Sequence, residues 1–345
     1  MPNSMKPSLA KNIKIIIITP AWIGDFVMMQ SILIAIKNKY PNSSIDVITP
    51  KFCAPLTEFM PEINKTIILD VAHGELGFKK RRNLAKSIQN KYDWAIILPI
   101  TFKSALIPFF AKIKVRTGFM GELRCWLLTD AIKLNKQKIP LMVNRYLKLS
   151  HTKEIIDIKN DDASLYPIFI VKKKITNPYK NKKPILALCP GAEYGKAKKW
   201  PIKYFRKIAK LAAKKYQVWV FGSHKDKNDG DKIVKNITNA VNFAGQTKLA
   251  KSIKLLSLVD MIITNDSGLM HVGCALDKKI IAIYGSSTPE HTPPLSKKAS
   301  IISTKINCKP CFEKTCKFGH YKCLTKIKPK ELLQKYIMVN YINKR

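Results

Sequence analysis

The sequence predicts an α/β protein with two doubly wound parallel-sheet domains. Short apolar, β-branched runs alternate with segments of helical periodicity along most of the chain. Glycine-containing loops follow several of these runs, and such loops are where open parallel sheets bind ligands. A Lys/Asn/Pro-rich stretch at 172–183 separates the alternation into two halves. The 345 residues and the hydrophobic content of 46% suffice for two separate cores.

The first half begins with a continuous β-branched run, 13–19, which is typical of a strand buried on both faces. A loop with Gly24 and Asp25 follows, and then an apolar helical pattern that Pro41 ends. Further strands are expected at 45–49, 67–69 and 94–98, with helices such as 83–89 between them. This alternation implies right-handed crossovers between parallel strands.

Loops at the carboxyl ends of these strands carry the candidate polar groups. Asp25 is expected either to face the crevice of the sheet as a reactive carboxylate or to cap its helix, and the residues favour neither. The loop 99–104 offers Lys103 and Ser104 to the same crevice. No G-x-G-x-x-G pattern follows the first strand, so a nicotinamide-dependent dehydrogenase is disfavoured.

The second half begins with a strand at 185–188 and a loop, 189–201, that suits a diphosphate. Gly191 and Gly195 allow the backbone to approach a ligand closely, and lysines follow at 196, 198 and 199. A flexible basic loop is the equally supported alternative. A helix at 204–214, a strand at 217–221 and a helix at 249–258 continue the alternation.

The segment 259–285 organises the second half as strand, tight turn, helix and strand. Its helix opens at Ser267 and Gly268, so the N–H groups of the first turn and the positive end of the helix dipole form an anion site. In the competing interpretation Asp266 and Ser267 merely cap the helix. His271 lies one turn inside the helix on the same side, which favours a phosphate or sugar site.

A net charge of +39 raises the question of a polyanionic partner. Residues 1–170 carry 25 basic and 13 acidic side chains, and the remainder carries 37 and 10, so the excess is spread over the chain. No nucleic-acid module is visible, so a basic nucleic-acid-binding protein is the disfavoured alternative. No window of 18 uninterrupted apolar residues occurs, so we expect no spanning helix and interpret 1–11 as a flexible extension.

Half of the eight cysteines form a cluster near the end of the chain, at Cys308, Cys311, Cys316 and Cys323. The C-x2-C spacing that is typical of zinc occurs at one end only. A zinc site and a loop of reduced thiols therefore both stay open. The other four cysteines stand among apolar residues and are expected to be small core residues.

Five blocks of sequence carry a resemblance to a known family. They are PAWIGDFVMMQSI (20–32), FKSALIPFFAKI (102–113), RTGFMGELR (116–124), CPGAEYGKAKKWP (189–201) and NDSGLMHVGCAL (265–276). In combination they resemble ADP-heptose:lipopolysaccharide heptosyltransferase II, in glycosyltransferase family 9, and the likeness covers 11–305. Ser267 departs from the threonine that is common in related heptosyltransferases, but the hydroxyl is retained.

The resemblance implies the GT-B architecture, in which two Rossmann-like domains face one another across a cleft. It places an acceptor-binding domain at 12–175, an ADP-sugar-binding domain at 184–305, and a cysteine-containing loop and helix at 306–345. The implied reaction moves L-glycero-D-manno-heptose from ADP-heptose to the first heptose of the lipopolysaccharide inner core, with inversion and without a cofactor or catalytic metal. A different core heptose or a Kdo acceptor is the alternative.

The resemblance also implies roles for single residues. Asp25 would be the general base and Lys198 would neutralise the departing ADP, although the adjacent Lys199 competes for that role. Donor contacts would come from Gly24, Gly191, Lys198, Asp226, Asp266, Ser267, Gly268 and His271, and acceptor contacts from Lys103, Arg116 and Arg124. The acceptor would be lipid A bearing Kdo and heptose, so we expect a cytoplasmic enzyme resting on the inner face of the inner membrane.

Overall fold

The computed structural model describes residues 12–72, 74–151, 163–173, 175–179 and 182–338. Contacts within the chain divide it into two compact units, Met1–Ile170 and Val171–Arg345, which are described separately below. Among the described residues, no helix combines the length and the apolar character that crossing a membrane requires. The domain limits expected above at 175 and 184 stay predictions.

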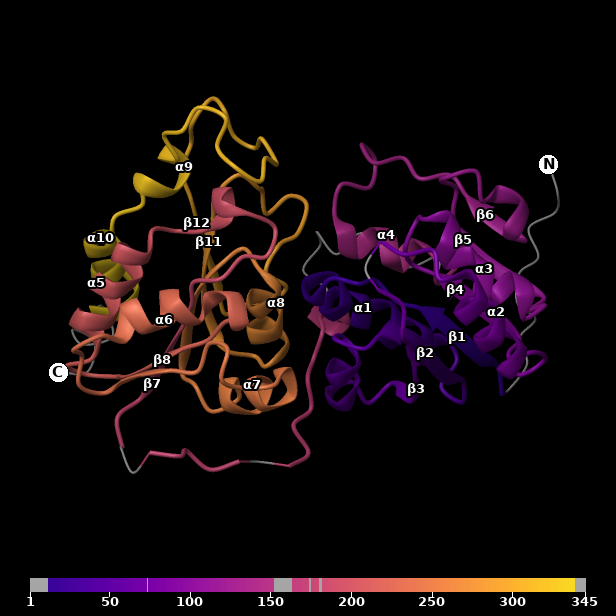
Figure 1. The fold of residues 1–345 in the computed structure, drawn as a ribbon, viewed down its shortest axis with the longest axis horizontal. Helices are drawn as coiled ribbons and strands as arrows, with labels where there is room; N and C mark the ends of the chain where they lie inside the picture. The colour runs from indigo at the N-terminus through magenta and orange to yellow at the C-terminus, as the bar shows by residue number, and fades with distance from the viewer. Residues whose placement is uncertain (1–11, 73, 152–162, 174, 180–181, 339–345) are drawn as a thin grey trace. The chain divides into compact units, whose positions relative to one another are not determined.

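The first unit is built on a parallel sheet of six strands in the order β3-β2-β1-β4-β5-β6 (Figure 1). The strands are β1 Lys14–Ile18, β2 Ser44–Pro50, β3 Ile63–Leu69, β4 Trp94–Ile97, β5 Val115–Phe119 and β6 Asp130–Ile132. The helices are α1 Ile23–Lys39, α2 Phe78–Ser87, α3 Phe102–Phe110 and α4 Met142–Lys148. The two central strands, β1 and β4, pair in register from Ile15 with Trp94 to Ile18 with Ile97.

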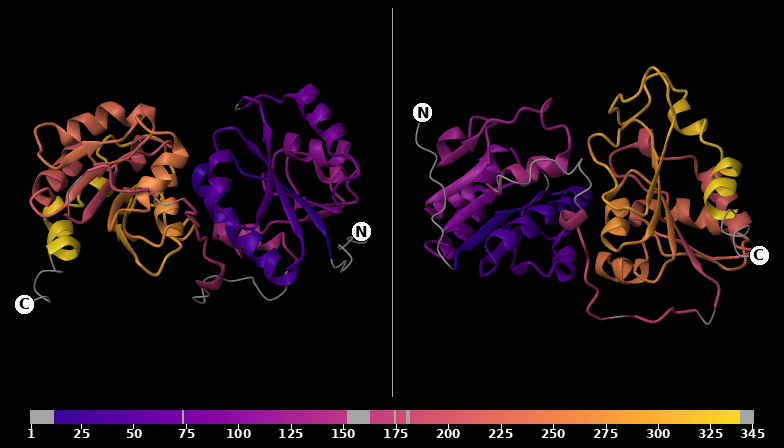
Figure 2. Two further views of the ribbon diagram at one scale, coloured as in Figure 1. Left: turned by 90° about the horizontal axis from the view of Figure 1, so that it is seen from below. Right: turned by 180° about the vertical axis from the view of Figure 1, so that it is seen from behind.

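Burial on both faces explains why the central strands are apolar throughout. Ile15, Ile16 and Ile17 of β1 are all fully buried. Ile16 and Ile18 pack with side chains of α2 and α3 on one face of the sheet. Helix α1 packs against α4 and buries ten of its residues, so it is apolar around most of its circumference. Helices therefore cover both faces, as in Figure 2.

The second unit repeats the same arrangement with the strand order β12-β11-β10-β7-β8-β9. Its strands are β7 Ile185–Cys189, β8 Gln217–Val220, β9 Ala240–Asn242, β10 Met261–Asn265, β11 Lys279–Tyr284 and β12 Ala299–Ser303. Its helices are α5 Ile202–Ala212, α6 Lys227–Val234, α7 Leu249–Leu256, α8 Gly268–Ala275, α9 Lys322–Thr325 and α10 Pro329–Leu333. Helix α10 returns to pack against α5 (Figure 1), and Leu332 joins the same core as Phe205.

Both sheets therefore have the doubly wound parallel order that the alternation of strands and helices predicts. The order reverses between β1 and β4 in the first unit and between β7 and β10 in the second. Ligands of such sheets bind outside the carboxyl ends of the strands at this switch point. The chain segments that follow these four strands contain the candidate residues Asp25, Lys103, Lys198 and Asp266.

The structure also corrects some expected boundaries. Gly24 and Asp25 lie in the first turn of α1, and Lys103 and Ser104 lie in the first turn of α3, where loops were expected. Helix α1 begins earlier because the Phe26 amide already donates to the Trp22 carbonyl over 2.8 Å. The short strands β5, β6, β9 and β12, with helices α4 and α6, were not predicted from the sequence.

Candidate active site

Asp25 occupies the first turn of α1, directly after the central strand β1. The carboxylate is half-buried and benefits from the positive end of the helix dipole. Burial, and secondarily the charge of Asp25, raises the pKa of the Cys53 thiol to about 12 and that of the Tyr146 hydroxyl well above 10. Asp25 therefore lies close enough to Cys53 and Tyr146 for its charge to act on both groups.

The three expected acceptor contacts differ in how far they reach solvent. Lys103 is half-buried, and its ammonium donates to the Glu75 carbonyl over 3.2 Å. Arg116 is also half-buried, and it donates to the carbonyls of Leu127 and Ile113 over 2.7 and 2.6 Å. Lys103 follows the carboxyl end of β4, the edge at which ligands of such sheets bind. Arg116 is the second residue of β5, and its carbonyl partners precede β5 and β6, so it lies at the opposite, amino edge of the sheet.

Arg124 is fully buried and lies out of reach of a ligand. Its guanidinium donates to the Phe119 carbonyl through Nε and Nη2 and to the Pro99 carbonyl through Nη1, over 3.0, 2.7 and 2.5 Å. Burial lowers its pKa to about 10, against the opposing charge of Glu122. Arg124 thus joins the segments that follow β4 and β5, and of the three expected acceptor contacts only Lys103 lies at the ligand-binding edge of the sheet.

The second unit places Lys198 beside Asp266 at the switch point between β7 and β10. Lys198 ends a short 3-10 turn, Lys196–Lys198, in the loop after β7. Its ammonium lies 2.6 Å from Asp266 Oδ2, and the two side chains are 16% and 3% exposed. It also lies 5.1 Å from the centre of the Tyr194 ring. A cation is therefore held at the edge of the sheet where an anionic ligand would bind.

Two residues that sequence reasoning missed complete this arrangement. Ser287, after β11, donates its hydroxyl to Asp266 Oδ2 over 2.5 Å. Asn265, the last residue of β10, accepts from the Trp200 amide over 3.0 Å and donates to the Pro190 carbonyl over 2.7 Å. Asn265 thus ties the loop after β7 to the end of β10. The only feature of the sequence that could have indicated this role of Asn265 is its position directly before Asp266.

The first turn of α8 opens beside this pair. Ser267 is the N-cap in an extended conformation, and its side chain makes no capping hydrogen bond to the first turn. The capping role that the sequence left open for Asp266 and Ser267 is therefore not seen. The helix begins at Gly268, whose missing side chain leaves these N–H groups accessible to an anion.

His271 lies one turn further along α8 and is 4% exposed. Burial lowers its pKa to about 4, which the nearby Asp266 opposes and the nearby Lys198 reinforces. The imidazole is consequently neutral at pH 7. It offers one N–H donor and one acceptor nitrogen in place of a positive charge.

The two adjacent lysines of the loop serve different carboxylates. Lys199 donates to Asp226 Oδ1 over 2.9 Å, whereas Lys198 pairs with Asp266. Burial favours protonation of Asp226, but Lys199 and Ser223 outweigh it and lower the pKa of the carboxyl. Asp226 also packs tightly on Gly191, where a Cβ atom would lie 2.5 Å from its Oδ2. The structure thus brings Lys198, Asp266, Ser267, Gly268 and His271 together, with Lys199, Asp226 and Gly191 in a neighbouring group.

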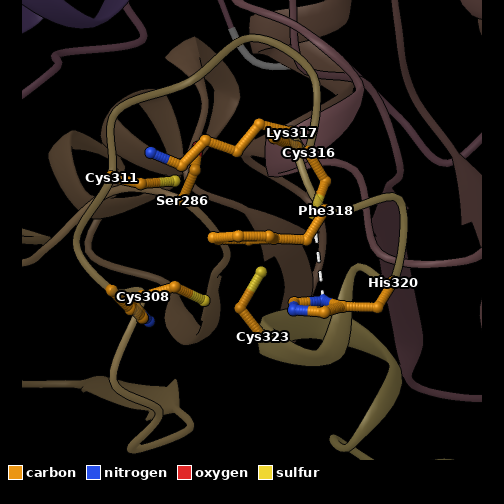
Figure 3. Close-up of a pocket in the computed structure, with 10 residues that line it drawn as sticks. Ser286, Cys308, Cys311, Cys316, Lys317, Phe318, His320 and Cys323 are labelled. Atoms are coloured by element: carbon orange, nitrogen blue, oxygen red, sulfur yellow. Dashed lines mark hydrogen bonds between the residues drawn. The ribbon is translucent and has the colours of Figure 1, made fainter.

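The four clustered cysteines line a pocket with Phe318 and His320 (Figure 3). Backbone N–H groups of the turn after Cys316, first that of Tyr321, donate to its sulfur and lower the pKa of this half-buried thiol. Within the described ranges, no three His, Cys, Asp or Glu side chains are placed so that they could hold one metal ion. The described geometry therefore does not support the zinc alternative.

This cysteine loop, 308–323, packs on the loop that carries Lys198. The Ala197 amide donates to the Lys314 carbonyl over 2.9 Å, and the Ser286 amide donates to the Ala197 carbonyl over 3.0 Å. The Ser286 carbonyl in turn accepts from Cys311 and Phe312. At Gly195 a Cβ atom would lie 2.4 Å from the Lys314 carbonyl oxygen. The cysteine loop thus supports the backbone directly before Lys198.

Comparisons with known proteins agree with this arrangement. The sequence profile of glycosyltransferase family 9 (heptosyltransferase) matches residues 81–322. Lipopolysaccharide heptosyltransferase 2 of Salmonella typhimurium is 40% identical over 336 residues, which are 93% of this chain and 97% of that protein. Lipooligosaccharide heptosyltransferase 2 of Haemophilus influenzae is 41% identical over 304 residues, 84% and 88% of the two chains. The solved structure of E. coli ADP-heptose lipopolysaccharide heptosyltransferase II superposes with a TM-score of 0.79 at 37% identity, and covers 93% of this chain and 96% of that one.

Proposed function

The chain belongs to glycosyltransferase family 9, and from this premise we propose that it transfers L-glycero-D-manno-heptose from ADP-heptose to the first heptose of the lipopolysaccharide inner core. The proposed reaction inverts the anomeric centre. The observation that carries the proposal is the ammonium of Lys198, held by Asp266 beside the uncapped first turn of α8. A cation and a helix N-terminus at the switch point of a parallel sheet suit the diphosphate of a nucleotide sugar.

Asp25 is the proposed general base. Inversion requires the acceptor hydroxyl to attack the anomeric carbon from the side opposite the departing ADP, and the attacking oxygen must lose its proton as the bond forms. A carboxylate is a group that can accept this proton, and Asp25 lies in the first turn of α1, directly after the central strand β1. Such general-base catalysis contributes about 10²–10⁴-fold to the rate.

Lys198 and the N–H groups of α8 are proposed to stabilise the leaving ADP. Negative charge builds on the β-phosphate oxygen as the glycosidic bond breaks, and preformed donors stabilise it without reorganising. Asp266 and Ser287 position the ammonium, and Asp266 and neutral His271 are proposed to bind hydroxyls of the sugar. Gly191 and Asp226 lie toward the proposed ribose site, and Gly24 lets the donor approach α1. No catalytic metal and no cofactor enter the proposal.

The acceptor is proposed to be lipid A bearing Kdo and heptose at the inner face of the inner membrane, with the enzyme cytoplasmic and peripheral. The net charge of +39 supports this, because each Lys or Arg near an anionic leaflet contributes about 1 kcal/mol of attraction. Lys103 is the proposed contact to a phosphate or carboxylate group of the acceptor. No nucleic-acid partner is proposed.

Transfer is tested with ADP-heptose and a set of defined core acceptors, followed by mass spectrometry of the acceptor. We expect one heptose to be added to the acceptor that ends in the first heptose, and the product to have the inverted anomeric configuration by NMR. Addition of EDTA is expected to leave the rate unchanged. Transfer only to a Kdo-terminated acceptor would instead assign the enzyme to the preceding step.

A further inference from the structure

We propose that one apolar face of the first unit inserts into the surface of an anionic membrane and so presents the acceptor to the enzyme; this rests on the proposed function. The docking face consists of Leu76, Phe78, Ile100, Met120, Leu123 and Trp126. All six side chains are exposed although they are large and apolar. Exposed apolar patches on a folded protein mark an interaction surface.

Ring contacts link Phe78 and Trp126, two members of the docking face, through half-buried rings of α3. Phe78 of α2 packs on Phe110 of α3 with ring centres 5.4 Å apart, and Phe110 packs on Phe109 at 5.6 Å. Trp126 contacts Phe109 at 5.5 Å and Phe102 at 6.2 Å. The rings thus run without a break from α2 across α3 to the turn after β5, and the rigid helix pair supports the exposed tips.

The segment after β5 holds its apolar side chains outward at a conformational cost. Glu122 and Leu123 both have positive φ, 42° and 56°, which is rare for bulky side chains. Leu123 is 89% exposed and Trp126 64%. Glu122 accepts from the Phe102 amide over 2.7 Å, and buried Arg124 fixes the Phe119 carbonyl from below. The chain therefore maintains a strained turn whose main result is to display a leucine to solvent.

Charge around the face selects an anionic lipid surface as its occupant. The exposed basic residues Lys79 and Lys80 follow Phe78, and Lys112 and Lys114 follow Phe110, whereas the acidic residues beside the face are Glu75 and Glu122. Aromatic side chains with flanking lysines are the pattern of segments that lie at a membrane surface, where rings enter the headgroup region and ammonium groups meet lipid phosphates.

The position of the face fits delivery of a lipid-linked sugar. Ile100 follows the carboxyl end of β4, and Met120 follows that of β5. These ends lie at the same edge of the parallel sheet as the end of β1, which leads to Asp25. An acceptor anchored in the leaflet that this face contacts would hold its sugar near the edge that carries the proposed base.

Binding of the full-length protein to vesicles tests the proposal. Vesicles of phosphatidylglycerol and phosphatidylethanolamine, and neutral phosphatidylcholine vesicles, are sedimented with the wild-type chain, with Leu123→Ser/Trp126→Ser, and with a matched control, Leu211→Ser/Ile301→Ser. The control removes two exposed apolar side chains from the second unit. We expect binding to the anionic vesicles only, about tenfold or more weaker in the docking-face variant and unchanged in the control.

Activity on two forms of the acceptor separates this proposal from the proposed function. The docking-face variant is expected to keep wild-type transfer to a deacylated, water-soluble acceptor and to lose most transfer to the acceptor in vesicles. If the docking-face variant binds anionic vesicles as tightly as the wild type does, the proposed docking face is refuted. Light scattering gives a second way to refute the membrane proposal. If the wild type self-associates, and the docking-face variant loses self-association but still binds vesicles, the face binds a second copy of the chain instead. Vesicle binding as expected, but no transfer to any acceptor, would instead refute the proposed function.

Discussion

Two neighbouring lysines with different partners give a prediction at the scale of the residue. Lys198 lies beside Asp266 and α8, whereas Lys199 is committed to Asp226. We expect Lys198→Met to lower kcat by about 10²-fold or more, because the leaving diphosphate loses its cation. Lys199→Met should lower kcat much less and should act on stability. Steady-state kinetics of both variants decide between them, and a larger kcat loss in Lys199→Met would reverse the assignment.

Burial of His271 gives a second prediction at this scale. Its folded-state pKa of about 4 lies below the ordinary 6.5, so the unfolded chain takes up this proton first as the pH falls. The stability that neutral His271 contributes is complete above pH 6.5 and is lost progressively as the pH falls toward 4. The loss amounts to about 3 kcal/mol at most. Urea unfolding of the wild type and of His271→Asn at pH 7 and 4.5 measures it; an equal pH dependence in both proteins would contradict the burial argument.

Some residues of the candidate site could be predicted from the sequence, and others could not. Asp25, Lys198 and Asp266 stood out because each follows a strongly apolar strand run. Ser287 did not, because it reaches Asp266 only through the fold, across 21 positions. The sequence could not separate Lys198 from Lys199 either, since one residue of offset in a loop does not fix a side-chain direction. Arg124 was expected at a surface, and its burial depends on carbonyl groups of two separate loops.

Among the elements, the cysteine loop gives the sharpest prediction. A Cβ atom at Gly195 would lie 2.4 Å from the Lys314 carbonyl oxygen and would push the two loops apart. We expect Gly195→Ala to raise the KM for ADP-heptose several-fold and to cost about 1–3 kcal/mol of stability. Gly319→Ala, where a Cβ atom meets nothing within 4 Å, strains only its own backbone and is the control. Equal KM values in the two variants would show that the cysteine loop does not position the donor loop.

Elements with strong, continuous patterns were predicted, and weakly patterned ones were not. The central strands β1, β4, β7 and β10 are buried on both faces and therefore read as apolar runs. Strands β6 and β9 have three residues each and lie at sheet edges, so their sequences carry almost no periodicity. The start of α1 was missed because Trp22 at its N-cap is no capping residue, and α3 was not predicted because Pro108 lies inside it.

For the whole molecule, the expected fold class and the family resemblance are both confirmed. The parallel order of each sheet follows from the alternation of strands and helices, and the match to the solved heptosyltransferase II covers 93% of the chain. Composition contributed little, because a charge of +39 suits nucleic acid and a membrane alike. The missing nucleic-acid module disfavoured the first, and the exposed apolar side chains beside lysines, which only folding reveals, support the proposed membrane contact.

The proposed mechanism requires a carboxylate of the first unit and an ammonium of the second to serve one reaction. Kinetics of Asp25→Asn, paired with calorimetric titration of ADP, test this most directly. We expect kcat to fall by about 10²–10⁴-fold and ADP affinity to stay at the wild-type value, because the base acts on the acceptor and not on the nucleotide. Turnover of Asp25→Asn within about twofold of the wild type, at which no general-base contribution remains, would contradict it.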